Sequence, residues 1–416
     1  MIQSCLSEGE VKPFVKNYGM VIVDECHHVS SVSFEQVLRQ VTATFVYGLT
    51  ATPIRKDGHQ PIIFMQCGKI RFTSDAKSQM ENQGFKRLLI PRFTSFRSIT
   101  SDRKTYVQIT QELSEDKVRN EFVMEDVKAA IQKGRTPLLL TTRTAHVKVL
   151  AQMLMPFADH VIQLIGADSA KEKRLALQNL QSIPTSESLV IVATGKYVGE
   201  GFDYPRLDTL FLTMPIAWKG NVEQYAGRLH RECEGKSEVC IYDYVDIRVP
   251  LCDSMYRKRL KGYIKAGYGK DVISPAPDKN SQELIYEQNN YEAAFRNDLA
   301  KAKHSVVIAV PKVKFKYKPS IMSALANLLH DGVSVVVHIK EEGANETELS
   351  NAGMDVVCNK EQTLQCAIID KSIVWYGNIN FFGYNSETNN VMRIADHKIA
   401  DEMMEILYSC HENKGK

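Results

Sequence analysis

Two adjacent acidic residues follow an apolar segment near the start of the chain. Residues 20–23 (MVIV) precede Asp24 and Glu25, and His27 lies two residues farther on. A carboxylate at the tip of a buried strand can hold a magnesium ion, and a neighbouring carboxylate can polarise an attacking water molecule. Two acids at an ordinary strand end would give the same pattern, so the pair alone does not decide between these interpretations.

A second apolar segment, residues 44–50, begins 20 residues after Asp24 and contributes Thr50 and Thr52 in the sequence LTATP. The carboxyl ends of neighbouring parallel strands meet at one edge of a sheet, where open α/β proteins bind their ligands. If the two segments are such neighbours, the acids and the threonines form a single site.

Three residues farther along have the spacing of one helix face. Gln224, Arg228 and Arg231 are separated by four and three residues, which predicts that they lie on the same side of a helix. A planar guanidinium suits phosphate better than an ammonium does. The pattern favours a phosphate-binding helix, and a solvated basic helix face is the alternative.

Glycines and hydroxyl groups follow the apolar segment 189–194. Thr194 and Gly195 come at its end, and Gly199 and Asp203 belong to the GEGFD stretch beyond it. Backbone N–H groups in such loops can contact phosphates.

Lysines alternate with apolar and aromatic residues in segment 312–318, KVKFKYK. Lys314, Lys316 and Lys318 can attract phosphates while the rings between them stack on bases. The alternative is a solvated sheet edge, where lysines oppose aggregation. A second basic cluster, residues 256–261, is predicted to lie on a helix. It is interpreted either as a nucleic-acid contact or as an exposed helix face.

Seven short segments rich in Val, Ile and Leu must position these residues. They show little polar alternation, which predicts parallel strands buried on both faces. The segments are residues 20–24, 44–50, 137–142, 160–165, 189–194, 208–215 and 239–244. Helical periodicity at 121–134 and 145–155 lies between strands, and this alternation predicts an α/β fold.

Changes in composition predict the domain boundaries. Residues 76–120 are polar without sustained periodicity, which indicates a connection between a first α/β block at 1–75 and a second at 121–266. Residues 267–287 contain Gly, Pro and Ser and predict a linker. A further α/β domain is expected at 288–412.

The overall composition excludes several classes of protein. The 416 residues are 44% hydrophobic and 24% charged, which is ordinary for a globular protein and excludes extensive disorder. We find neither an apolar run of about 18 residues, as a membrane span needs, nor a secretory signal pattern. Nine cysteines without a CxxC pair favour reduced thiols in the cytoplasm. The net charge of +3 neither favours nor excludes nucleic acid as a partner.

In this order and spacing, the motifs resemble those of superfamily 2 helicases of the DEAD/DEAH-box type, among them type III restriction helicases. DECH at 24–27 looks like motif II, LTATP at 49–53 like motif III, PLLLTTR at 137–143 like motif IV, ATGKYVGEGFD at 193–203 like motif V and QYAGRLHR at 224–231 like motif VI. The resemblance covers about residues 1–265. It implies two RecA-like lobes, the first incomplete, with ATP in the cleft between them and nucleic acid lying across both.

The resemblance also implies residue roles. Asp24 would bind magnesium through water, and Glu25 would activate the hydrolytic water. The other nucleotide-binding and coupling positions would be His27, Thr50, Thr52, Gly199, Asp203, Gln224, Arg228 and Arg231, with both arginines as arginine fingers. The positions facing nucleic acid would be Thr142, Arg143, Thr194 and Gly195.

One departure from the family concerns the phosphate loop. Family members carry GxxxxGK followed by Ser or Thr, the Walker A loop, upstream of motif II. Only 23 residues precede Asp24, and the pattern is absent. We therefore expect the chain to begin inside the first lobe, through gene truncation or with a Walker A segment supplied by another chain. An open sheet edge at 43–51 would then favour self-association.

Residues 288–412 resemble phospholipase-D-like α/β domains in arrangement but not in catalytic residues. The family signature is HxK, four residues, Asp, six residues and GSxN. Asp370, Gly377 and Asn380 match it, whereas Thr363, Gln365 and Asn378 stand where His, Lys and Ser are required. Because the missing His is the family's nucleophile, the resemblance implies a domain without phosphodiesterase activity.

We therefore predict the C-terminal portion of an ATP-dependent DNA or RNA helicase or translocase, fused to an inactive phospholipase-D-like module for nucleic-acid binding or assembly. ATP and Mg²⁺ would serve the intact parent, nucleic acid would be the partner with DNA favoured over RNA, and no membrane is expected. The alternative is a non-enzymatic nucleic-acid-binding or assembly protein built from the same folds. The layout resembles restriction and defence helicases, and the expected location is the cytoplasm.

Overall fold

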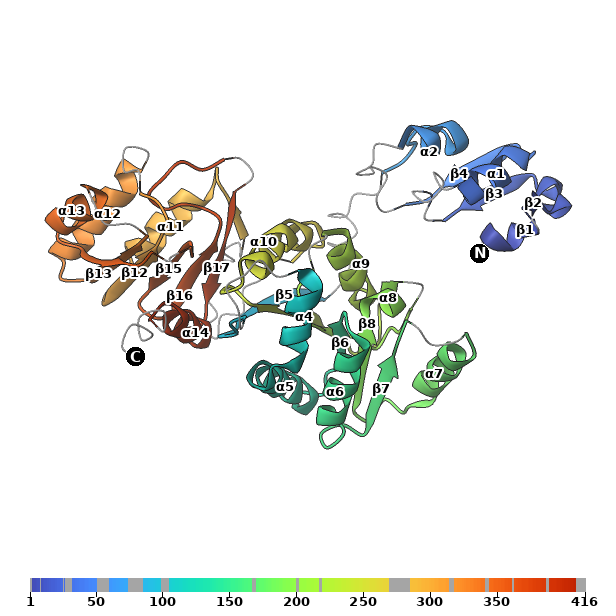
Figure 1. Ribbon diagram of the computed structural model, residues 1–416, viewed down its shortest axis with the longest axis horizontal. Coiled ribbons are helices and arrows are strands. Elements are labelled where there is room, and N and C mark those ends of the chain that lie inside the picture. Colours follow the sequence, from blue (N-terminus) through green and yellow to red (C-terminus); the bar gives the residue numbers. More distant parts are fainter. Residues whose placement is uncertain are drawn as a thin grey trace. The chain divides into compact units, whose positions relative to one another are not determined.

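The computed structural model describes most of the chain. The described residues are 2–7, 9–24, 26, 32–50, 60–73, 85–98, 105–166, 170–199, 202–216, 219–268, 285–313, 318–340, 344–360, 363–386 and 389–408. They belong to two compact units, Met1–Asp75 and Ala76–Lys416, and the second unit contains two large sheets (Figure 1).

The N-terminal unit is built on two parallel strands, β3 (Met20–Val23) and β4 (Phe45–Gly48). Helices α1 (Val32–Gln40) and α2 (Gln60–Cys67) pack on one face of this pair, where Val23 is buried. Four short elements come first in the chain: η1 (Ile2–Cys5), β1 (Leu6–Ser7), β2 (Glu10–Val11) and η2 (Pro13–Asn17). The expected parallel pairing of the two motif-bearing strands is confirmed.

The opposite face of the β3–β4 pair is apolar and exposed. Met20, Ile22, Phe45 and Tyr47 alternate with the inward-facing residues and are 47–60% exposed. Parallel strands are normally covered on both faces. Among the residues that the structure describes, β3 and β4 pair only with each other. Self-association through residues 43–51 stays a prediction.

The central domain, residues 85–268, holds six parallel strands in the order β5-β10-β9-β6-β8-β7. Their bounds are β5 (Lys86–Phe93), β6 (Pro137–Thr141), β7 (His160–Leu164), β8 (Leu189–Thr194), β9 (Thr209–Leu212) and β10 (Glu238–Val245). The strands β6, β8 and β9 are buried along their whole length, as their uninterrupted apolar sequences predict.

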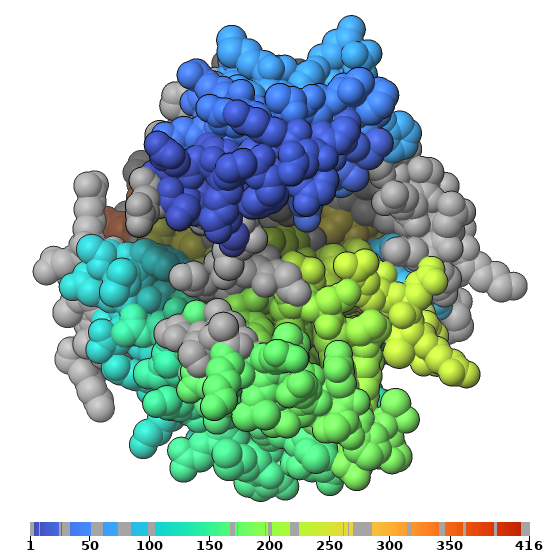
Figure 2. Space-filling model, turned by 90° about the vertical axis from the view of Figure 1, so that its right-hand side faces the viewer, coloured from blue at the N-terminus to red at the C-terminus, as the bar shows by residue number. Residues whose placement is uncertain are grey.

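Helices cover both faces of this sheet. They are α4 (Tyr106–Glu115), α5 (Lys117–Gln132), α6 (Thr144–Leu154), α7 (Ala170–Ser182), α8 (Gly195–Gly199), α9 (Lys219–Leu229) and α10 (Pro250–Lys265). Leu139 of β6 packs with α5 and α6, whereas its neighbours Leu138 and Leu140 pack with α9 and α10 on the other side. One outer surface of this domain, to which α7 contributes, is green in Figure 2.

Part of the segment 76–120, which was expected to connect two α/β blocks, belongs to the central domain. Within it, β5 pairs with β10 over eight residues, and α4 and the start of α5 pack in the central domain. Arg87 and Arg92 are buried and made this strand look polar, and Pro91 is tolerated because β5 is an edge strand of its sheet.

The C-terminal domain, residues 285–408, has a seven-stranded mixed sheet in the order β11-β17-β16-β15-β12-β13-β14. The strands are β11 (Ile285–Glu287), β12 (Ser305–Ala309), β13 (Ser334–Ile339), β14 (Asp355–Cys358), β15 (Cys366–Ile369), β16 (Ile373–Gly377) and β17 (Asn390–Ala395). The helices are α11 (Tyr291–Leu299), α12 (Pro319–His330), α13 (Ala344–Asn351) and α14 (His397–Tyr408). In the described part of the chain, no helix is both long and apolar enough to span a membrane.

The central and C-terminal domains share a hydrophobic core. Helix α14 lies against β5, and the ring centroids of Phe93 and Tyr376 are 5.0 Å apart (Figure 1). One cation connects three elements there: Arg92 contacts the carboxylates of Asp126 on α5 and Glu402 on α14 at 2.8 Å each. The second unit is therefore packed as one body and not as two tethered domains.

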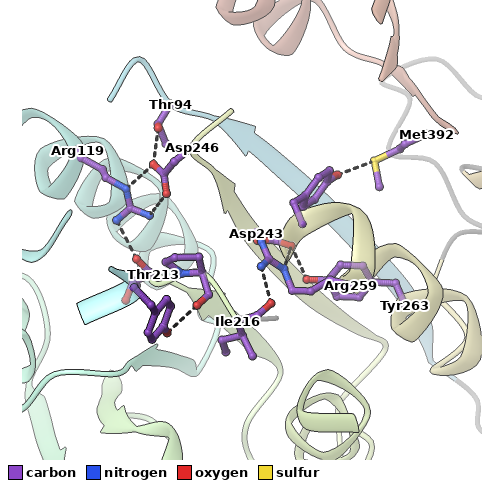
Figure 3. Close-up of polar contacts among 12 residues, drawn as sticks. Thr94, Arg119, Thr213, Ile216, Asp243, Asp246, Arg259, Tyr263 and Met392 are labelled. Carbon is purple, nitrogen blue, oxygen red and sulfur yellow. Dashed lines mark hydrogen bonds and ion pairs between the residues drawn. The ribbon is translucent and has the colours of Figure 1, made fainter. Parts of the chain in front are cut away.

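Two buried acids at the end of β10 anchor the surrounding helices (Figure 3). Arg259 of α10 donates two hydrogen bonds of 2.8 and 2.9 Å to Asp243 and a third, of 2.7 Å, to the carbonyl of Ile216. Arg119 of α5 donates two of 2.7 and 3.0 Å to Asp246. All four charged side chains are at most 1% exposed.

Replacing Asp243 with Asn should destabilise the second unit strongly. The substitution leaves the buried Arg259 guanidinium without a compensating charge, and breaking a buried pair in this way costs about 3–5 kcal/mol. Glu187→Gln, at a pair with His160 that is 35–45% exposed, should cost less than about 1 kcal/mol. Urea unfolding of both variants measures the difference, and equal costs would contradict the assignment.

The junction should weaken as the pH rises towards neutrality. Burial raises the pKa of Glu402 to about 7, against the opposing effects of Arg92 and Lys398, and Asp126 competes for the same guanidinium. A raised pKa in the folded state means that this contribution to stability is full below about pH 4.5 and is lost as the pH rises from there through about 7. Thermal unfolding from pH 5 to 8 should show this loss in the wild type and a smaller one in Glu402→Gln. Identical pH dependence in both proteins would contradict it.

Candidate functional site

The ends of β3 and β4 are joined by hydrogen bonds beside the motif residues. The N–H of Leu49 donates to the carbonyl of Val23, and the N–H of Cys26 donates to the carbonyl of Leu49, both at 2.9 Å. Asp24, which is exposed, and Thr50, which is half-buried, therefore stand at neighbouring strand ends. The expected juxtaposition is confirmed for these two. Glu25, His27 and Thr52 lie outside the described residues.

Gly48 allows this close approach. A Cβ atom at this position would lie 2.8 Å from the sulfur of Cys26 and 3.0 Å from the Cβ of Cys67. A larger residue would therefore push the end of β4 away from the segment that follows Asp24.

In the central domain, the ends of β6 and β8 place two predicted residues together. Thr141 and Thr194 are opposite each other in register, so Thr142 and Gly195 follow at the same edge of the sheet. Thr142 is exposed. Thr194 is different from the expectation, because it is only 8% exposed and its hydroxyl accepts a hydrogen bond of 2.9 Å from the N–H of Gly166. The Thr194 hydroxyl therefore stabilises the neighbouring loop and is not available to a nucleic-acid strand.

Arg143 immediately precedes α6, as its N-cap residue, and is half-buried. Its guanidinium donates to the carbonyl of Val107 at 3.4 Å, and its N–H donates to the hydroxyl of Thr141 at 3.3 Å. Part of its side chain therefore connects α6 to α4, which limits the expected contact with nucleic acid.

His146, a residue that the sequence analysis missed, holds this turn in place. Burial lowers its pKa to about 3, so the ring is neutral. Its Nε2 lies 2.9 Å from the amide oxygen of Asn120, which can only accept, so Nδ1 accepts from the hydroxyl of Thr141 at 2.9 Å. A lone histidine at the third position of a helix gives no sequence signal for this role.

The expectation of one helix face for Gln224, Arg228 and Arg231 was wrong for Arg231. Helix α9 ends at Leu229, and Arg231 lies beyond it. The ammonium of Lys236 terminates the helix by donating to the carbonyls of Leu229 and Arg231 at 3.1 and 2.7 Å. Gln224 is exposed and Arg228 is half-buried on α9.

Arg231 instead pairs with another predicted residue. Its Nε donates to Asp203 at 3.1 Å, and the two side chains are 54% and 47% exposed. The structure thus brings a motif V acid and a motif VI arginine together, which their separation of 28 residues conceals. Gly199 ends α8, close in sequence to this pair.

In the C-terminal domain, Asp370 has a structural role. Its carboxylate accepts hydrogen bonds of 2.8–2.9 Å from the N–H groups of Lys303, His304 and Ser305. Its φ of 49° places it in the tight turn between β15 and β16, which Asp tolerates better than most residues. These contacts lower the pKa of the carboxyl group.

The other positions of the signature also hold the backbone together. The Oδ1 of Asn378 accepts from the N–H of Asn390 at 2.7 Å, and the Nδ2 of Asn380 donates to the carbonyl of Lys312 at 2.8 Å. A Cβ at Gly377 would collide with the carbonyl of Asn390. The two remaining positions stand where the signature has His and Lys. Thr363 is exposed, and the backbone carbonyl of Gln365 accepts a hydrogen bond of 3.3 Å from the N–H of Gly377.

Lys318 does not have the exposure that was expected of it. It is 8% exposed, and its ammonium lies 2.8 Å from the carboxylate of Glu292 and 5.1 Å from the ring centroid of Tyr291. We therefore exclude it from the nucleic-acid contacts. Lys314 and Lys316 lie outside the described residues.

Comparisons with known proteins support a helicase-like protein. A family model described as "Type III restriction enzyme, res subunit" matches residues 2–55. The chain is 24% identical over 230 residues to "Probable helicase D10" of Escherichia phage T5, covering 55% of this chain and 49% of that protein. The chain spans about half the length of the curated relatives it matches.

Two solved structures show partial likeness. "The crystal structure of T4 UvsW" aligns with a TM-score of 0.37 and 17% identity over 61% of this chain and 54% of that chain. "NucT from Helicobacter pylori" aligns with a TM-score of 0.27 and 16% identity over 31% of this chain and 94% of that chain.

Asp370→Ala should lower the stability of the C-terminal domain, and it should not change phosphodiesterase activity, because we expect none in the wild type. The variant leaves three N–H groups without their acceptor, which should cost about 1–3 kcal/mol. Asp370→Asn keeps one acceptor oxygen and should lose less. We expect no phosphodiester cleavage by wild type or variants. Cleavage by the wild type that disappears in a folded Asp370→Ala protein would contradict this structural assignment.

Proposed function

We propose that this chain is the C-terminal portion of an ATP-dependent helicase or translocase that acts on nucleic acid, with DNA favoured over RNA. One observation carries the proposal: the motif-matching residues lie at the carboxyl ends of parallel strands, with Asp24 beside Thr50 in one unit and Thr142 beside Gly195 in the other. This is the edge at which open α/β sheets bind ligands.

Each unit has residues that would contact a nucleotide. Asp24 is an exposed carboxylate at a strand end, and such a group suits a magnesium ion that retains most of its water. When bound, the magnesium would neutralise charge on the triphosphate. Arg228 and Arg231 would contact the phosphates, and Arg231 would exchange its partner Asp203 for them.

The C-terminal domain would bind nucleic acid or organise an assembly, and it would not cleave phosphodiesters. Its signature positions Asp370, Gly377, Asn378 and Asn380 are engaged in backbone contacts. Because it shares a core with the central domain, it would stay fixed to that domain.

The alternative function, nucleic-acid binding or assembly without ATP turnover, is favoured by one feature of the sequence. No GxxxxGK pattern followed by Ser or Thr occurs in the 416 residues, so this chain alone lacks a recognisable phosphate loop. The two functions differ in whether a longer protein supplies that loop.

The chain by itself should have no appreciable ATPase activity, with or without nucleic acid. The backbone cradle and lysine that bind the β- and γ-phosphates are missing, and Asp24 and Glu25 cannot replace them. Steady-state phosphate release measures this, and added single-stranded DNA is the stimulated condition. Turnover in the range of about 1–100 s⁻¹ that Glu25→Gln abolishes would contradict it.

A further inference from the structure

A pocket of about 410 Å³ opens at the carboxyl edge of the central sheet. It lies past the ends of β6, β8 and β9, which are neighbours, and between the helices α4, α9 and α10. Pockets of about 300–1,000 Å³ are typical of sites for small organic groups. Thr142 and Gly195, two of the proposed nucleic-acid contacts, are part of its wall.

The floor of the pocket is apolar and fixed. Leu140, Met214 and Met255 are 1–5% exposed, and Tyr225 is 6% exposed. Gly195 explains how the tyrosine fits, because a Cβ there would lie 2.5 Å from the Tyr225 hydroxyl. The floor therefore consists of carbon, sulfur and aromatic-ring surface that is already shielded from water. Such a surface suits a flat ligand group.

The rim combines an aromatic ring with polar groups. Tyr106 is 37% exposed, and Thr142 and Lys258 are exposed as well. Lys258 lies one turn of α10 beyond the floor residue Met255, so its ammonium can reach an anion above the opening. The pocket thus presents apolar surface below and a hydroxyl and a cation above.

Tyr106 is held in position before any ligand arrives. Its hydroxyl donates to the carbonyl of Pro215 at 2.9 Å. It begins α4, and the hydroxyl of Thr105 accepts from the N–H of Gln108 while the Gln108 side chain accepts from the N–H of Thr105. This reciprocal cap fixes the helix start, so the ring loses little freedom on contact with a ligand.

We propose that this pocket takes one nucleobase of a bound single strand, which stacks on Tyr106 while Lys258 and Thr142 contact the adjoining phosphates. A base is a flat apolar group joined to an anion, and the floor and rim match these two parts in that order. The inference rests on the proposed function, since it assumes that nucleic acid lies along Thr142 and Gly195.

The test compares two strands of 12 nucleotides that have the same phosphates. One is oligodeoxyadenylate, and the other carries abasic sites at its six central positions. Fluorescence anisotropy of the full chain measures both affinities. The wild type should bind the strand with bases about 5- to 100-fold more tightly, as one stacked base predicts.

Two variants distinguish stacking from a structural effect. Tyr106→Ala should remove the preference for bases and leave the affinity for the abasic strand unchanged. Tyr106→Phe keeps the ring and should keep the preference, although it loses the hydrogen bond to Pro215. Lys258→Ala should weaken both strands equally and lower the salt slope by about one. Urea unfolding confirms that each variant is folded.

The outcomes separate this inference from the proposed function. Binding of neither strand by the wild type would overturn both. Equal binding of the two strands, or equal weakening of both by Tyr106→Ala, would overturn the base pocket and leave nucleic-acid binding standing. Millimolar AMP that abolishes the preference without displacing the strand would assign the pocket to a free nucleotide, and so would also overturn the inference.

Discussion

The arrangement of the second unit depends on two buried ion pairs at the end of β10. Asp243 and Asp246 lie at the carboxyl end of one central strand, and each receives the guanidinium of a different helix, Arg259 of α10 and Arg119 of α5. Both arginines also donate to backbone carbonyls of the segment after β9, at Thr213 and Ile216. A buried charge requires its partner, so the two helices and this segment have little freedom to shift. The same segment and α10 form part of the pocket that we assign to a base.

The junction with the C-terminal domain extends this rigid body. Arg92, Asp126 and Glu402 connect β5, α5 and α14, and Tyr376 of β16 contacts both Phe93 and the carboxylate of Asp253 on α10. Because they share this core, the central and C-terminal domains form one body. The binding role that we propose for the C-terminal domain would therefore act at a fixed distance from the carboxyl edge of the central sheet.

The parts of this structure that could be predicted from sequence are those with uniform environments. The strands β6, β8 and β9 are entirely apolar and buried on both faces, so their residue types identify them directly. Strand β5 could not be recognised, because its two arginines are buried and the acids that pair with Arg92, Asp126 and Glu402, are distant in sequence. The same cause explains Lys318, since its partner Glu292 lies 26 residues away. Helix α9 was extended too far, because its end depends on Lys236.

We propose above all that the carboxyl edge of the central sheet is a preformed surface for nucleic acid. Hydrogen–deuterium exchange of the full chain with and without a saturating single strand tests it most directly. The account predicts slower exchange on binding in residues 105–108, 141–144, 195–199 and 219–229. Slower exchange restricted to residues 285–408, with the carboxyl edge unchanged while the strand is bound, would contradict it.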